Sequence, residues 1–142
     1  MPQSTEAVNT VAAGGGTIRM MQFTVKAGNT VHAGTIVAVD ATGFAVAAAD
    51  AAGLQVAGIA LDTGSGGQAV NVQSGDWWLA LDTSTPGSMS MGNGLRKVAC
   101  AVDDHTVNLA AKTTNAISVG VAYDFDAAAG LVRVAVGDGV RQ

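Results

Sequence analysis

The densest group of residues able to do chemistry is Asp103-Asp104-His105, in which two carboxylates precede an imidazole. Such a run offers ligands to a metal ion, but a zinc site needs three or four close ligands. The other histidine, His32, lies far away along the chain in a turn-like stretch. We therefore expect the three residues to form a polar turn, with no bound metal and no cofactor.

Three other motifs are fragments of known sites. Asp124-Phe125-Asp126 matches part of a calcium loop but lacks the remaining ligand positions, including the final Glu. Gly64-Ser65-Gly66-Gly67 lacks the Gly-Lys-Ser/Thr ending of a phosphate loop. Cys100 lies in the apolar run Val98–Val102, where a thiol is expected to act as a small buried hydrophobe rather than a nucleophile. These patterns predict that the protein is not an enzyme.

The most distinctive pair is Trp77-Trp78. Neighbouring residues on a strand point to opposite faces of a sheet, so one indole is expected in the core and the other at the surface. An exposed indole can stack on a sugar or anchor a protein contact. The sparse charge of the chain favours the protein contact.

Composition indicates one small β-rich domain. Of the 142 residues, 49% are hydrophobic but only 4% aromatic, and Gly occurs 19 times. Val favours strands and Gly punctuates them, which predicts many short strands joined by tight turns. Charged residues amount to only 13%, which suits a surface partly covered by neighbouring proteins.

Charge and hydropathy exclude several classes of partner. The net charge is −4, and the seven Lys and Arg residues are scattered, so the cationic cluster that nucleic acid requires is missing. No segment approaches the roughly 20 apolar residues of a membrane helix. The single cysteine excludes an intrachain disulfide, which fits assembly in a reducing cytoplasm.

The chain divides into an N-terminal arm with a Gly hinge, residues 1–16, and a single β-rich domain, residues 17–142. The arm, Met1–Ala13, is followed by Gly14-Gly15-Gly16, where each glycine explores both signs of φ. In an assembling protein such an arm becomes ordered on contact with a partner. The residues predicted at an interface are Thr5, Val8, Val11, Trp77 and Trp78.

Alternating apolar residues and turn signals predict the strands of the domain. Ala47–Ala52 is expected to form one helical turn, since Ala is the best helix former. Asp82–Gly94 is expected to be a loop. The predicted strands are 18–25, 35–39, 44–47, 56–61, 69–73, 77–81, 95–102, 106–110, 117–123 and 131–136.

The second half of the domain echoes the first. Gly58-Ile59-Ala60-Leu61-Asp62 resembles Gly120-Val121-Ala122-Tyr123-Asp124 at an offset of 62 residues (120 minus 58). Further upstream Val39-Asp40 resembles Val102-Asp103 at an offset of 63 (102 minus 39). The pattern predicts an internal duplication, with repeats at about 34–76 and 97–138, packed into one sandwich or barrel.

Several short motifs together resemble the capsid decoration (cement) proteins of tailed phages. They are Val31-His32-Ala33-Gly34-Thr35-Ile36-Val37, Phe44-Ala45-Val46-Ala47, Val56-Ala57-Gly58-Ile59-Ala60, Thr106-Val107-Asn108-Leu109, Val119-Gly120-Val121-Ala122 and Gly130-Leu131-Val132-Arg133-Val134. The tandem Trp pair and the loop after it match no motif of that family.

The resemblance implies a structural virion protein whose fold is a small β-barrel or β-tulip-like domain. Such a protein binds the outer capsid surface, often as a homotrimer, and stabilises the head by bridging subunits of the major capsid protein. It would be assembled in the host cytoplasm, with no nucleic acid and no membrane as partner. The alternative is a carbohydrate- or receptor-binding β module of a virion or cell surface, acting through an exposed Trp and turn Asp residues.

Overall fold

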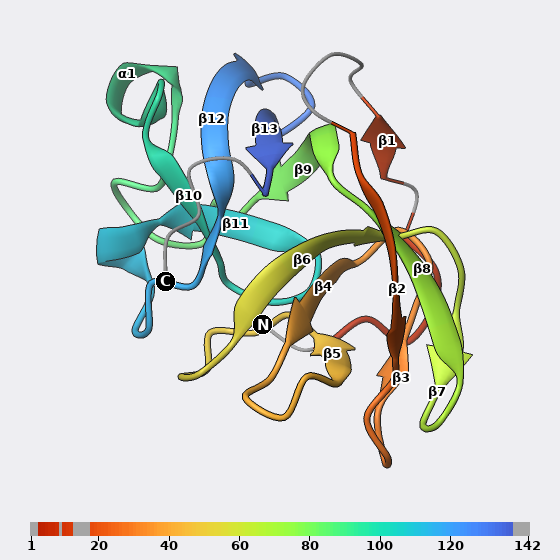
Figure 1. The fold of residues 1–142 in the computed structure, drawn as a ribbon. Coiled ribbons are helices and arrows are strands. Elements are labelled where there is room, and N and C mark those ends of the chain that lie inside the picture. Colours follow the sequence, from red (N-terminus) through yellow and green to blue (C-terminus); the bar gives the residue numbers. More distant parts are fainter. Residues whose placement is uncertain (1–2, 9, 13–17, 138–142) are drawn as a thin grey trace.

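Strands are the dominant regular secondary structure of the chain, and its helices are single short turns. The computed structural model describes residues 3–8, 10–12 and 18–137. Its strands form two five-stranded units, unit 1 (residues 18–74) and unit 2 (residues 75–137), which pack against each other (Figure 1). The predicted all-β class and β-barrel architecture are confirmed. None of the helices in the described ranges is long and apolar enough to cross a membrane.

Unit 1 is a sheet whose two edges meet at one point. Its strands lie in the order β2-β8-β6-β4-β5. Just past β2, Val25 forms a parallel bridge to Ala45, the first residue of β5. A short ribbon, β3 (Thr30–Val31) with β7 (Gly64–Ser65), lies beside the sheet. The five strands are β2 (Met20–Thr24), β4 (Ile36–Val39), β5 (Ala45–Ala47), β6 (Gln55–Ala60) and β8 (Ala69–Gln73).

Unit 2 is a closed barrel. Its strands follow the order β9-β11-β10-β12-β13, and β13 pairs back with β9. The arm adds the short strand β1 (Val11–Ala12) along β9. The connections carry helix α1 (Met91–Gly94) and the 3₁₀ helix η1 (Ala110–Lys112). The strands are β9 (Gly75–Leu81), β10 (Val98–Ala101), β11 (Thr106–Leu109), β12 (Ser118–Asp126) and β13 (Leu131–Val136).

The two units share one topology, so the internal duplication is visible in the hydrogen-bonded register. In each unit the second strand pairs with the third and the fourth, and the first runs parallel to the third. Ile36 pairs with Ile59 in unit 1. Val98 pairs with Val121 in unit 2, and both partners lie 62 residues later (98 minus 36, 121 minus 59). A bulge interrupts this pairing at the matching place in both units.

The predicted offset of 63 between Val39 and Val102 is wrong. Val39 pairs with Ala45, whereas the residue that pairs with Val107 is Ala101, which is again 62 residues later (101 minus 39). The likeness of Asp40 to Asp103 therefore comes from two turns that use an Asp at adjacent positions, and the register does not shift.

The first strands of the two units are related by a different offset in residue number. Met21 pairs with Val72, and Trp77 pairs with Val134, the counterpart of Val72. This offset is 56 (77 minus 21), because the connection to the second strand is six residues longer in unit 2 (62 minus 56). Gly75 and Asp76, placed at the end of the first repeat by sequence, open the first strand of the second unit.

Each unit has an interior of small apolar side chains. The interior residues of unit 1 are Val25, Val37, Ala45, Ala60, Val70 and Val72, and their counterparts in unit 2 are, in the same order, Leu81, Ala99, Val107, Ala122, Val132 and Val134. The strand β4 is buried on both faces, since Ile36 and Ala38 join the cluster of unit 2 while Val37 points into unit 1. This explains its unbroken apolar sequence.

Two corresponding glycines allow the strands to approach closely. A Cβ atom on Gly120 would lie 2.0 Å from the carbonyl oxygen of Ala135, and one on Gly58 would lie 2.6 Å from that of Gln73. Both distances are shorter than any ordinary contact. The Gly that opens the repeated motif is therefore required by the pairing of the fourth and fifth strands.

Two local expectations are wrong. Residues 48–52 continue from β5 as a turn without helix, because the chain there must pass from β5 to β6 within seven residues (54 minus 47). The segment 82–94, expected to be a loop, ends in helix α1. Ser90 is the N-cap of this helix, and its backbone N–H donates to the Asn93 side chain in a capping box.

Gly120→Ala is expected to lower the free energy of unfolding by roughly 2 kcal/mol or more, since overpacking against a backbone atom cannot be relieved by a rotamer change. Gly92→Ala is the matched control, because the nearest atom to its added Cβ is 4.0 Å away. Urea denaturation of both variants measures the difference. Equal stability of the two variants would contradict the close-approach argument.

Candidate functional site

The polar cluster of the sequence fastens the N-terminal arm. Asp104 is fully buried in the turn between β10 and β11. The backbone N–H of Ser4 donates to both of its carboxylate oxygens, at 3.1 and 3.2 Å, and the Ser4 hydroxyl donates to one of them at 3.1 Å. Nδ1 of His105 lies 2.9 Å from Asp104 Oδ1 and 3.1 Å from Ser4 Oγ. The cluster thus holds a neighbouring segment of the same chain.

Asp103 shapes the turn that carries this cluster. Its Oδ1 accepts the backbone N–H groups of His105 at 2.9 Å and Thr106 at 2.8 Å, together with the Thr106 hydroxyl at 2.8 Å. An Asp that bonds to backbone donors two and three residues ahead stabilises a tight turn. Asp103, Asp104 and His105 each offer one ligand atom within 4.8 Å of the others, but protein donors already occupy most of these oxygens.

The arm next crosses the start of unit 1. The backbone N–H of Val8 donates to Ala33 O at 2.7 Å, and the Thr10 hydroxyl donates to Gly34 O. A Cβ on Gly34 would lie 1.6 Å from the carbonyl oxygen of Val8. The backbone of the arm therefore packs directly on Gly34, and a residue with a Cβ atom does not fit at this position.

The arm ends as a strand on unit 2. Val11 pairs with Trp78 and Ala12 with Trp77 in an antiparallel ladder. Directly opposite residues lie on the same face of a sheet, so the side chains of Val11 and Trp78 share the outer face of the barrel. Val11 is 54% exposed.

The outer face beside Trp78 also carries an ion pair. Arg133 lies opposite Trp78 on β13, and its guanidinium donates to Asp76 Oδ2 at 2.9 Å. We call the surface formed by Val11, Asp76, Trp78 and Arg133 the arm face. It combines an aromatic side chain, an apolar side chain and a fixed ion pair, which is the mixture typical of protein interfaces.

The five residues predicted at an interface are divided among four places. Thr5 is exposed on the stretch of arm that Asp104 holds, and Val8 lies over Gly34. Val11 and Trp78 are brought together on the arm face. Trp77 is only 6% exposed and belongs to the core, where its indole N–H donates to Ser74 O at 3.4 Å. Trp78 is therefore the indole of the pair that can contact a partner.

Cys100 is buried in β10. Burial raises the pKa of its thiol, with a further contribution from the negative charge of Asp50. A thiol that stays protonated is a poor nucleophile.

Comparison with known proteins gives no relative from which a role could be transferred. No family model, curated protein or solved structure matches this chain. Any functional conclusion must therefore come from the geometry and from the motifs themselves.

Sequence reasoning missed the groups that hold the arm. The sequence predicts Asp104 as a turn residue only. Its contact with Ser4 was missed because the two residues are 100 positions apart in the chain. The only local signal was the clustering of two Asp with a His. The predicted hinge, Gly14-Gly15-Gly16, lies outside the described residues, as do Met1, Pro2, Asn9 and Ala13 of the predicted arm.

Gly34→Ala is expected to detach the arm, because the new methyl group and the Val8 carbonyl cannot occupy the same space. Hydrogen exchange of the Val8 amide should then accelerate at least tenfold. Gly28→Ala is the matched control, since Gly28 has the same φ of 83° but nothing within 4 Å of an added Cβ. Equal acceleration in both variants would mean that backbone strain, and not the arm contact, is responsible.

Proposed function

We propose that this protein is a capsid decoration protein, which binds the outer surface of a tailed-phage head and stabilises it by bridging subunits of the major capsid protein. The proposal rests on the resemblance of the repeated motifs and on the geometry of the arm. It assigns the protein a structural role with no reaction, and a homotrimeric state on the virion surface.

The observation that carries the proposal is the path of the arm across both units. Gln3 donates to Thr30 O of unit 1 at 2.8 Å, and Ser4 then binds Asp104 of unit 2. Val8 returns to unit 1 and Val11 ends on β9 of unit 2. An extended segment laid over two barrels gives a long, shallow contact surface, which suits attachment to a broad protein shell.

Exposed apolar side chains supply contact area on both units. An interface gains roughly 25 cal/mol for each Å² of apolar surface removed from water, less the losses of association. Many copies on one shell add avidity to a weak single contact. The large exposed apolar residues of the described chain are Val11, Ile18, Met20, Met21, Phe44, Leu61, Met91, Leu95 and Tyr123.

One feature favours the alternative, a carbohydrate- or receptor-binding module. Trp78 lies directly opposite Arg133, whose partner is Asp76. Sugars stack on indole rings and bond to charged groups beside them. A glycan array separates the two proposals. Only the alternative predicts that the protein binds a glycan on the array and that Trp78→Ala removes this glycan binding.

Trp78→Ala is expected to weaken capsid binding about 30-fold, since loss of an aromatic anchor costs about 2 kcal/mol. The measurement is co-sedimentation with undecorated tailed-phage capsids assembled from purified major capsid protein. Lys112→Ala is the control, because Lys112 is an exposed residue of η1 that belongs neither to the arm face nor to the exposed apolar residues. Wild-type protein that stays in the supernatant would overturn the proposal.

A further inference from the structure

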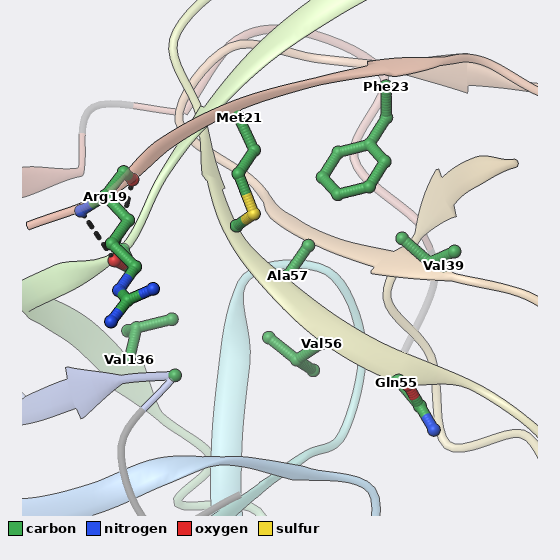
Figure 2. Close-up of a pocket in the computed structure, with 10 residues that line it drawn as sticks. Arg19, Met21, Phe23, Val39, Gln55, Val56, Ala57 and Val136 are labelled. Atoms are coloured by element: carbon green, nitrogen blue, oxygen red, sulfur yellow. Dashed lines mark hydrogen bonds between the residues drawn. The ribbon is translucent and has the colours of Figure 1, made fainter. Parts of the chain in front are cut away.

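A cavity of about 380 Å³ lies at the open end of unit 1, which we call its mouth, where Val136 and Gly137 of unit 2 form one side of it. Figure 2 shows Met21 and Phe23 pointing from β2 towards Ala57 on β6, with Val39 and Val56 completing the apolar walls. Arg19, Gln55 and Ser74 supply polar groups at its rim. This cavity lies apart from the arm face.

The duplication shows what fills the same place in unit 2. Met21 and Trp77 are counterparts, because each is paired with the matching residue of the fifth strand. Trp77 is 6% exposed, whereas Met21 is 38% exposed. An indole therefore closes the mouth of unit 2, and a slender thioether leaves the mouth of unit 1 unfilled.

At two more wall positions the residue of unit 1 is smaller or more polar than its counterpart in unit 2. Gln55 and Ala57 of unit 1 correspond to Ile117 and Val119 of unit 2, 62 residues later, and both counterparts are buried. Phe23 is larger than its counterpart Leu79, and so adds an aromatic wall to the cavity of unit 1. Met21, Gln55 and Ala57 are thus smaller or more polar than their counterparts in unit 2, which leaves room on the β6 side of the cavity, opposite Phe23.

The strand above the cavity has an accessible edge. In unit 2, β1 pairs with β9 at Trp77 and Trp78. The counterparts in unit 1 are Met21 and Gln22 of β2, which pair with β8 on one side. Within the described ranges no strand pairs with them on the other side. An extended segment can therefore approach the cavity along this edge, as β1 approaches β9.

The rim carries one positive charge. Arg19 is exposed, its backbone is fixed by Ser74, and none of the ion pairs of the described residues includes its guanidinium. Figure 2 places this side chain at the side of the cavity next to Val136. A ligand with a carboxylate at this side could pair with the Arg19 guanidinium. The site would then select its ligand by negative charge as well as by shape.

We propose that the mouth of unit 1 binds an aromatic side chain of indole size, presented by an extended segment of a partner protein with an acidic residue next to it. The bound aromatic ring would fill the mouth of unit 1, as the indole of Trp77 fills the corresponding place in unit 2. This inference does not depend on the partner being a capsid, and it can fail while the capsid proposal stands.

The test uses the full chain with ¹³C-methyl methionine and NMR. The probe is the peptide acetyl-Ala-Trp-Asp-Ala-amide, with a dissociation constant expected on the order of 1 mM. The Met21 methyl should shift saturably. The neighbouring Met20 methyl, 64% exposed on the opposite face of β2, is the internal control and should not move.

Three comparisons decide the proposal. Met21→Trp removes the reporting methyl, so binding to this variant is followed through the indole proton signals of the peptide; the substitution should abolish binding and raise the melting temperature, whereas Met20→Trp should leave binding unchanged. Should Met21→Trp fail to fold, Ala57→Val narrows the same cavity. Arg19→Gln should remove the preference for the Asp peptide over acetyl-Ala-Trp-Lys-Ala-amide.

Two results would overturn the inference. One is a Met21 methyl that does not respond, or responds no more than that of Met20. The other is free indole-3-acetate binding as tightly as the peptide, which would assign the site to a small molecule and not to a partner chain.

Discussion

The narrow bore of a five-stranded barrel is the constraint on which the rest of this structure depends. Barrel diameter grows with strand number, and eight strands are needed for an interior that ordinary side chains just fill. The matched interior positions of the two five-stranded units are filled by Val and Ala, with Leu81 as the one larger residue, and the aromatic Trp77 and Phe23 lie on the first strands. The same tightness forces Gly58 and Gly120 to lack a side chain. A composition rich in small apolar residues and poor in aromatics is therefore a direct consequence of the architecture.

Much of this fold could be predicted from sequence, because strand alternation and turn residues are local signals. The strands at 69–73 and 131–136 were predicted at their observed limits, and the offset of 62 was visible in the repeated Gly-x-Ala motif. The limits of the repeats could not be predicted in the same way. The first strands, β2 and β9, share almost no sequence, and a different offset relates them, so that only the pairing of Met21 and Trp77 with equivalent partners reveals them as counterparts.

The arm contacts could not be predicted for a physical reason. Ser4 and Asp104 are 100 residues apart, and Val8 and Gly34 meet only after unit 1 has folded. Neither contact leaves a periodic pattern in the chain. The turn chemistry of Asp103 was predictable, because an Asp bonds to backbone groups only a few residues ahead. The role of Asp104 was not, since a buried carboxylate reveals its partner only in three dimensions.

The duplication also carries a consequence for symmetry. Each chain carries two units of one topology that differ where Met21 stands in one and Trp77 in the other. Any assembly of this protein therefore contains the two kinds of unit in a fixed one-to-one proportion, without a second gene. In the proposed homotrimer there would be three of each kind, so that six similar units would obey only threefold symmetry.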